Sequence, residues 1–410
     1  MTDSASHATL RRNLLRAIVQ GLLAGVLLSA AFAGGFYYRD MLAKRPATAA
    51  SFSLLSEVEA LLNQHFLYPI PDEETRVHGA VNGLVASYDD PYTIFVEPQA
   101  AEVDTGNLAG RFGGIGAEIG QDEQGRFVIQ RVYRDNPAHE AGLQEGDIII
   151  AVDGVALDPV RHDLNTVISM IRGNVGDPVV LRIQRGGQTL EFEVIRAEVL
   201  IPSTFWRILD DDPRIGYIQI VRFTERAPQE LRQALSELGG QGAEALVLDL
   251  RNNGGGLVDS AVAVAGEFLD GGVVLYEERQ GGAERVFNAS RGGAALDLPL
   301  VVLINQNTAS AAEIVAGAIQ DRGRAQLVGQ PSFGKGSVQL ILPVSDGSSL
   351  HVTTAQWFTP AHHRLEGQGL TPDVVVQPVE GTDAELAAAV EELQTMLPMP
   401  GSRSNYRLIG

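Results

Sequence analysis

The chain of 410 residues contains no cysteine and only two lysines, against 29 arginines. The absence of cysteine excludes disulfide bonds, thiolate metal sites and a cysteine nucleophile, and it suits a chain that works outside the reducing cytoplasm. The lysines are Lys44 and Lys335, so Lys335 is the only lysine beyond the N-terminal segment. Because the sequence otherwise uses arginine for positive charge, the isolated Lys335 is a candidate for a chemical role.

Lys335 differs from the arginines in its capacity to lose a proton. A buried lysine becomes a neutral amine, whereas arginine stays protonated. The pKa of a lysine must fall by roughly 2 to 3 units for it to act as a base near neutral pH, and burial is the ordinary cause. We therefore predict that Lys335, between Gly334 and Gly336, is a general base; the alternative is a lysine without a function.

The formal net charge of −20 argues against nucleic acid or an anionic membrane surface as a partner, because both would be repelled. Three arginines, Arg11, Arg12 and Arg16, precede an uncharged and mostly apolar run over residues 17–36. A run of roughly 20 residues can span a membrane. We predict a single uncleaved anchor within residues 1–40; a removable signal peptide is the alternative, and both place the remainder outside the cytoplasm.

The remainder of the sequence changes character three times. Residues 41–98 carry apolar residues at helical spacing and predict a pair of helices. Residues 99–198 contain short β-rich stretches separated by glycine turns, which indicates a small β domain. Residues 199–380 alternate strands with helices, which is typical of a layered α/β sheet, and residues 381–410 begin with an amphipathic helix.

Ser310 follows the apolar strand 300–304 and precedes a helix. A serine in such a turn lies beside free backbone N–H groups and the positive end of the helix dipole, which stabilise an oxyanion. Ser310 is therefore a candidate nucleophile. Capping of the helix by Thr308 or Ser310 is the alternative.

Two further segments fit this chemistry. In a strand that starts near Lys335, residues four apart share a face, so we expect Gln339 to contact the lysine amine through its side-chain carbonyl. Residues 251–256 (RNNGGG) follow a predicted strand, and Gly254 and Gly255 are candidates for turning their amides toward an oxyanion. Arg251 is expected to pair with Asp249.

The histidines have no spacing that suits a metal site, and we predict neither a metal nor a cofactor. A Ser-His-Asp triad that uses His351 or His362 stays open on the residues alone. It would leave Lys335 without a role.

Three blocks carry a resemblance to a known family: residues 249–256 (DLRNNGGG), 307–314 (NTASAAEI) and 329–339 (GQPSFGKGSVQ). With these three blocks in this order and spacing, the chain resembles the C-terminal processing peptidases, or tail-specific proteases, over nearly all of residues 50–380. The resemblance implies a crotonase-like α/β core with Ser310 as nucleophile, Lys335 as base and Gln339 as its partner. It also implies that Ala311 and the glycine loop supply the oxyanion amides.

The β-rich segment resembles a PDZ domain inserted before the peptidase core. Residues 112–116 (FGGIG) match the carboxylate-binding loop of such domains, and residues 136–148 contain the stretch that follows it. The resemblance implies that a peptide C-terminus binds at four consecutive residues. These are Gly113, Gly114, Ile115 and Gly116. Arg172 aligns with an arginine that couples the PDZ domain to the active site in some relatives.

These observations predict an anchored or secreted serine endopeptidase that captures proteins with apolar free C-termini. A PDZ adaptor with an inactive peptidase fold is the first alternative, and intact Ser310, Lys335 and Gln339 speak against it. A crotonase-type acyl-CoA enzyme is the second. It usually needs a carboxylate acid or base, and only Glu313 is near. The sequence leaves a homo-oligomer open.

Overall fold

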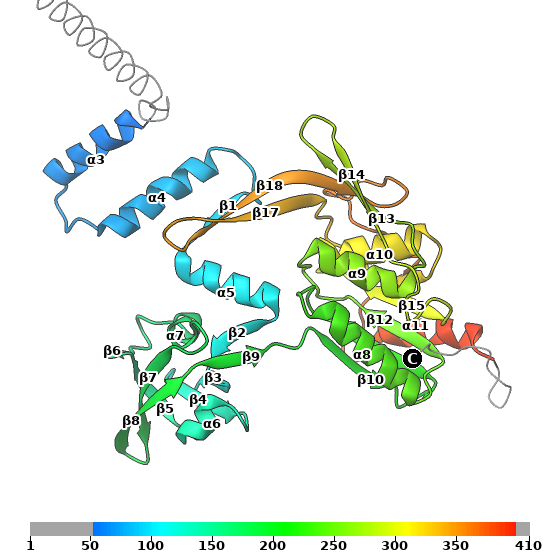
Figure 1. The fold of residues 1–410 in the computed structure, drawn as a ribbon, viewed down its shortest axis with the longest axis horizontal. Helices are drawn as coiled ribbons and strands as arrows, with labels where there is room; N and C mark the ends of the chain where they lie inside the picture. The colour runs from blue at the N-terminus through cyan, green and yellow to red at the C-terminus, as the bar shows by residue number, and fades with distance from the viewer. Residues whose placement is uncertain (1–51, 399–410) are drawn as a thin grey trace, which may run out of the picture. The chain divides into compact units, whose positions relative to one another are not determined.

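A computed structural model of the chain describes residues 52–398 (Figure 1). The predicted anchor, residues 1–40, lies outside the described residues. Within residues 52–398, no helix is both long enough and apolar enough to cross a membrane. The described chain divides into two compact units, which meet between Val77 and His78.

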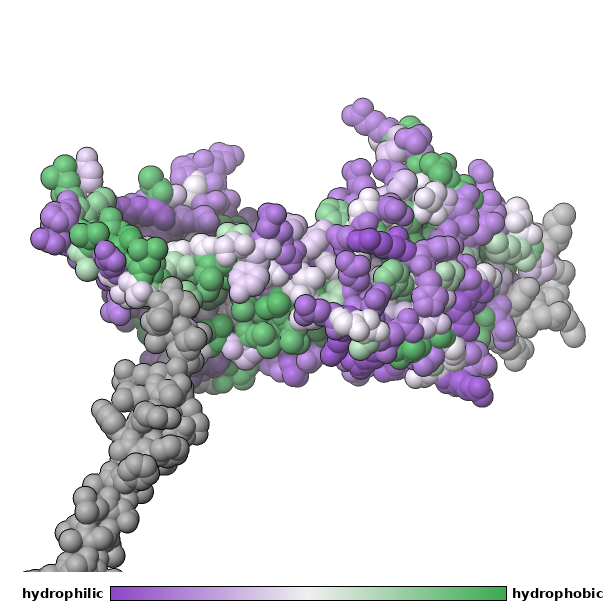
Figure 2. Space-filling view, turned by 90° about the horizontal axis from the view of Figure 1, so that it is seen from above, coloured by the Kyte–Doolittle hydropathy of each residue, from purple (hydrophilic) through white to green (hydrophobic). Residues whose placement is uncertain are grey.

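The helical pair predicted before the β domain is present. Helix α3 spans Ser53–His65, and helix α4 spans Glu73–Ala86 and continues from the first unit into the second. Apolar side chains of α3 are exposed, among them Leu54 (67% exposed) and Leu61 (50%). Figure 2 shows that hydrophobic residues gather in patches on the face it draws. An apolar surface of this kind is typical of segments that contact other molecules.

The β domain is built on one antiparallel sheet in the strand order β3-β4-β5-β7-β8, with β6 paired to β5. Alternate residues of its strands, such as Phe127, Ile129, Leu181 and Ile183, are fully buried, because successive side chains of a strand point to opposite faces. Strand β3 pairs only with β4 in the described chain, so it is an edge strand. The elements are β3 (Ala117–Gln121), β4 (Phe127–Val132), α6 (Pro137–Ala141), β5 (Ile148–Val152), β6 (Val155–Ala156), α7 (Leu164–Ile171), β7 (Pro178–Arg185) and β8 (Gln188–Ile195).

A two-stranded ribbon and one helix flank this domain. Strand β2 (Arg111–Gly114) pairs with β9 (Ala197–Leu200), so the two ends of the domain lie side by side. Helix α5 (Pro98–Ala109) precedes β2 and ends at Gly110, which has a left-handed backbone conformation. This arrangement explains how a β domain is inserted between helical and α/β segments.

The α/β segment that follows the β domain contains a six-stranded sheet in the order β10-β11-β12-β15-β16-β19. Strands β10 and β11 are antiparallel and the other pairs are parallel. The strands are β10 (Thr204–Ile208), β11 (Ile215–Ile220), β12 (Ala245–Asp249), β15 (Leu300–Ile304), β16 (Gln326–Gly329) and β19 (Val374–Val375).

Helices cover both faces of this sheet. One face carries Leu246, Leu248 and Val302, which pack with α8 (Ala227–Gly240), α9 (Val258–Phe268) and α10 (Ala311–Asp321). The opposite face carries Val247, Val301 and Leu303, which pack against α11 (Ala384–Met396). Strands buried on both faces read as continuous apolar runs, as LVVLI of β15 does.

A second sheet in this part of the chain is antiparallel. Its strand order is β1-β18-β13-β14, and β17 also pairs with β18. Its strands are β1 (Ile94–Val96), β13 (Val273–Arg279), β14 (Glu284–Asn288), β17 (Ser337–Pro343) and β18 (Ser349–Phe358). Strands β13 and β14 were not among the elements that the sequence predicted.

Three loops leave the carboxyl ends of neighbouring parallel strands. They follow β12, β15 and β16 and comprise residues 250–257, 305–310 and 330–336. Carboxyl ends of parallel strands meet at one edge of a sheet, which is where ligands bind in such folds. The topology therefore brings the glycine loop, Ser310 and Lys335 to the same edge.

Candidate active site

Ser310 occupies a strained turn between β15 and α10. Its backbone has φ 55° and ψ −118°, a positive φ that is rare for a residue other than glycine. Such strain concentrates at functional sites, where the surrounding structure holds it. The next residue, Ala311, is the first of helix α10, so its N–H has no acceptor within that helix. The turn thus places Ser310 at the N-cap of α10, beside the N–H of Ala311. The capping alternative is also met, because Ser310 and Glu313 form a capping box.

Glu313 holds the loop of Ser310 and the loop of Lys335 together. Its carboxylate accepts hydrogen bonds from the backbone N–H of Ser310 (2.8 Å) and of Lys335 (2.9 Å). It also accepts from the N–H of Gly334 (2.8 Å) and the hydroxyl of Ser332 (2.6 Å). One carboxylate therefore fixes the backbone positions of both candidate catalytic residues.

Glu313 is fully buried, and burial raises the pKa of its carboxyl group against the effect of these hydrogen bonds. With four donors already directed at it, the carboxylate has no free position for a substrate. The structure therefore gives Glu313 a positioning role and removes the carboxylate that an acyl-CoA enzyme would need. The spacing Ser310-x-x-Glu313 is that of a capping box, a signal that was present in the sequence.

The side chain of Lys335 lies in a half-buried site beside Gln339 and Tyr92. Its Nζ donates a hydrogen bond to Oε1 of Gln339 (2.6 Å) and lies 4.8 Å from the centre of the Tyr92 ring. Within residues 52–398, no carboxylate forms an ion pair with it. Burial lowers the pKa of Lys335, while the charges of Glu366 and Asp90 oppose this decrease. A lowered pKa favours the neutral amine that a general base requires.

The predicted contact of Lys335 with Gln339 is present, but the reason for it differs from the prediction. Lys335 precedes strand β17, which begins at Ser337, and the register of β17 shifts between Val338 and Gln339. Simple alternation along a strand therefore does not bring the two side chains together. Instead, Nε2 of Gln339 donates to the backbone oxygen of Tyr92, which turns Oε1 toward the lysine. The sequence did not identify Tyr92.

The glycine loop packs directly against the turn of Ser310. A Cβ on Gly255 would lie 2.9 Å from the backbone oxygen of Ala309 and 3.0 Å from the nitrogen of Ala311, so only glycine fits there. The N–H of Gly255 donates to Oδ1 of the buried Asn253 (2.8 Å), whereas Gly254 is exposed beside the cavity. The amide of Gly255 is therefore engaged, which leaves those of Ala311 and Gly254 as the candidates for binding an oxyanion.

These groups line a cavity of about 320 Å³. Its walls include Ser310, Lys335, Gln339 and the three glycines 254–256. His351 of β18 also faces the cavity, and its Nε2 is buried without a hydrogen-bond partner. Burial lowers the pKa of His351, and the charge of Lys335 adds to this decrease, although Asp104 opposes it. Within residues 52–398, no cluster of three or more histidine or acidic side chains is placed to hold a metal ion.

The predicted ion pair between Arg251 and Asp249 is present. Arg251 lies 2.7 Å from Asp249 and also contacts two acidic residues near the start of α11, Asp383 and Glu385, each at 2.7 Å. The hydrogen bonds from Arg251 lower the pKa of Asp383. Arg251 is therefore structural, and it anchors the first residue of the glycine loop.

A second groove, of about 1080 Å³, lies in the β domain between edge strand β3 and helix α7. Its lining includes Ile115, Ile119, Ile168 and Ile171, so it is largely apolar. The groove opens beside the β2–β3 loop, where Gly114, Ile115 and Gly116 line it. Gly113 does not line this groove. It lies in β2, opposite Glu198 of β9, and faces an adjoining cavity. Three of the four predicted peptide-binding residues thus meet in one groove.

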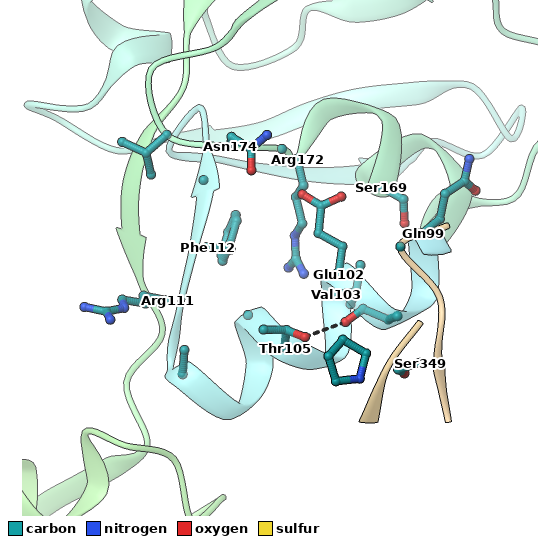
Figure 3. Close-up of a pocket in the computed structure, with 18 of the residues that line it drawn as sticks. Gln99, Glu102, Val103, Thr105, Arg111, Phe112, Ser169, Arg172, Asn174 and Ser349 are labelled. Carbon is teal, nitrogen blue, oxygen red and sulfur yellow. Dashed lines mark hydrogen bonds between the residues drawn. The ribbon is translucent and has the colours of Figure 1, made fainter. Parts of the chain in front are cut away.

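Arg172, at the end of α7, lines both the groove and the adjoining cavity of about 680 Å³ (Figure 3). Its guanidinium lies 3.9 Å from the centre of the Phe112 ring, and the two side chains lie side by side in Figure 3. Burial lowers the pKa of Arg172, and its Nε has no hydrogen-bond partner among the described residues. The adjoining cavity also reaches α5 and β17, since Thr105 and Ile341 line it.

Comparison with known proteins gives consistent results. The model of peptidase family S41 matches residues 214–376, and that of the PDZ domain matches residues 128–185. A carboxy-terminal-processing protease of Bartonella bacilliformis is 35% identical over 315 residues, which cover 75% of this chain and 71% of that protein. A carboxyl-terminal-processing protease of Synechocystis is 38% identical over 314 residues, or 74% and 71% of the two chains. The solved structure of a photosystem II D1 C-terminal processing protease matches with 30% identity and a TM-score of 0.48, over 87% of this chain and 93% of that chain.

Proposed function

This chain belongs to peptidase family S41 and is a serine peptidase with a PDZ domain, and from this premise we propose that it cleaves peptide bonds with a Ser310–Lys335 dyad. The observation that carries the proposal is one cavity lined by Ser310, Lys335, Gln339 and the glycine loop. The hydrogen bond from Lys335 to Gln339 orients the amine without supplying a negative charge that would hold its proton. A serine activated by a lysine is a known variant of the catalytic triad.

In the proposed reaction, the neutral amine of Lys335 accepts the proton of the Ser310 hydroxyl. The serine oxygen attacks the peptide carbonyl carbon, and the N–H groups of Ala311 and Gly254 stabilise the negative oxygen of the tetrahedral intermediate. The ammonium of Lys335 then donates its proton to the leaving amine, which leaves an acyl-enzyme on Ser310. Water hydrolyses this ester, with Lys335 again as the base.

The PDZ domain is proposed to select apolar free C-termini. The exposed edge of β3 supports addition of a peptide strand, and amides at Ile115 and Gly116 suit a terminal carboxylate. The isoleucines of the groove suit an apolar last side chain. Arg172 is proposed to couple occupancy of this groove to the peptidase, because it lines both the groove and the cavity that reaches β17.

Two further proposals concern the fold class of the peptidase core and the location of the protein in the cell. The mostly parallel sheet and the turn at Ser310 support a crotonase-like assignment of the peptidase core. The apolar run over residues 17–36, together with the absence of cysteine, supports action outside the cytoplasm from a single N-terminal anchor.

A direct test uses the full chain in detergent with an unfolded protein that ends in an apolar tail. Mass spectrometry of the products should find new termini with the natural chain and none with Ser310→Ala. A folded natural chain that binds the tail but releases no product would instead support the PDZ adaptor with an inactive peptidase fold.

A further inference from the structure

Helix α11 lies outside the segment that matches the peptidase family, residues 214–376, yet its first turn reaches the active-site loops. The side chain of Glu385 in this turn is 13% exposed. One carboxylate oxygen, Oε2, accepts from Nη1 of Arg251 at 2.7 Å, and the other, Oε1, accepts from Nε2 of Gln330 at 2.8 Å. Glu385 therefore bridges two side chains that belong to different loops.

These two loops carry the proposed catalytic groups. Arg251 begins the glycine loop, in which Gly255 packs against the turn of Ser310. Gln330 begins the loop that ends with Lys335, and its backbone N–H donates to the oxygen of Ile304 at the end of β15 (3.1 Å). A displacement of either loop would change the distance between the oxyanion amides and the base.

Further contacts hold the rest of this network. Arg251 is also held by Asp249 and by Asp383, the residue that caps α11 by accepting from the N–H of Leu386 (3.0 Å). Asp249 accepts in addition from the hydroxyl of Tyr217 (2.7 Å). The remainder of α11 is fixed on the sheet by buried Ala389 and Leu393. Glu385 therefore links both loops to a helix that is itself packed on the sheet.

We propose that Glu385 is a positioning residue for catalysis. It holds the glycine loop (residues 250–257) and the loop that contains Lys335 (residues 330–336) at a fixed distance from each other, and so makes α11 a part of the catalytic unit. The inference rests on the proposed dyad. Small displacements in an active site reduce turnover strongly, so loss of the bridge should lower kcat while leaving tail binding in the PDZ groove unchanged.

The test exploits the chemistry of the Glu385–Gln330 contact, which joins one carboxylate and one amide. In the full chain, Glu385→Ala removes the bridge, and Gln330→Glu sets two carboxylates against each other. The double variant Gln330→Glu/Glu385→Gln exchanges the groups: the new glutamine can accept from Arg251 and donate to the new glutamate. Glu391→Ala, at an exposed position of the same helix, is the matched control.

We expect kcat to fall about ten- to a hundredfold in Glu385→Ala and Gln330→Glu, with KM nearly unchanged. The double variant should recover most of the loss, and Glu391→Ala should match the natural chain. Rates are expressed per active serine, counted by reaction with a fluorophosphonate, and melting temperatures are measured alongside.

An unchanged kcat in Glu385→Ala would overturn the inference. So would a loss of activity that disappears when rates are expressed per active serine, because Glu385 would then affect only the amount of folded protein. A double variant as slow as Gln330→Glu alone would also overturn it. If the natural chain itself cleaves nothing, the proposed function fails instead.

Discussion

The side-chain nitrogen of Lys335 lies 2.6 Å from the side-chain oxygen of Gln339. A neutral oxygen orients the amine through a hydrogen bond but does not stabilise the ammonium form as a carboxylate would. The geometry therefore suits a lysine that must gain and lose a proton in each catalytic cycle.

Replacement of Lys335 by arginine should abolish activity. Arginine retains the charge and much of the reach but cannot give up its proton. We expect Lys335→Arg to lose about a thousandfold or more in kcat/KM, as Ser310→Ala should. Peptide cleavage assays measure this, with melting temperatures as the control for folding. Proteolysis retained in Lys335→Arg would rule out the proposed dyad.

The rate should rise with pH through the pKa of Lys335. The neutral amine is the active form, so kcat/KM is lost as pH falls below this pKa, which burial places below its ordinary value of 10.5. The carboxylate of Glu366 raises the pKa of Lys335, so Glu366→Gln should lower it further. The midpoint of the pH profile should then move to lower pH.

The matched control for this profile is Glu391→Gln, an exposed glutamate of α11. Its midpoint should coincide with that of the natural chain. A midpoint that does not move in Glu366→Gln, or that moves to higher pH, would contradict the assignment of Lys335 as the titrating base.

Removal of the side chain of Gln339 should slow turnover without affecting tail binding. Gln339→Ala deletes the group that orients the amine and frees the backbone oxygen of Tyr92. We expect kcat to fall about ten- to a hundredfold. Fluorescence anisotropy of a labelled apolar peptide should show unchanged binding. A normal rate would reduce Gln339 to a structural residue of β17.

Cleavage should depend on a free C-terminus. Amides at the β2–β3 loop pair favourably with a carboxylate and gain little from a neutral amide. Two peptides of the same sequence, one ending in a free acid and one amidated, should therefore differ about tenfold or more in kcat/KM. Equal rates would show that the β domain does not select C-termini, while the peptidase assignment would stand.

Glu313→Gln should lower both stability and activity. The amide of glutamine would point an NH₂ group at donors that now converge on a carboxylate, including the N–H of Ser310 and of Lys335. We expect a loss of about 2–4 kcal/mol in the free energy of unfolding, measured with urea. Ser332→Ala removes one of the four donors, together with the hydroxyl that accepts from the N–H of Leu370, and should cost less. A stability equal to that of the natural chain would show that the four contacts do not hold the two loops.

The sequence alone predicted the PDZ segment, and it proposed Ser310, Lys335, Gln339 and the glycine loop as the candidate site. Each of these signals is local: an isolated lysine, a serine after an apolar strand, consecutive glycines. Local patterns also predicted the parallel strands β11, β12 and β15, because strands buried on both faces consist mainly of apolar residues.

Only the tertiary structure decided which partners these residues meet. Tyr92 reaches Gln339 across 247 positions, and Glu385 reaches Arg251 across 134, so no spacing along the chain could indicate either contact. The shift of register in β17 and the engagement of the Gly255 amide by Asn253 depend likewise on how strands and loops pack. Local sequence determines the chemical groups and the turns that carry them, whereas the pairing of strands distant in sequence determines the angles and distances at which those groups meet.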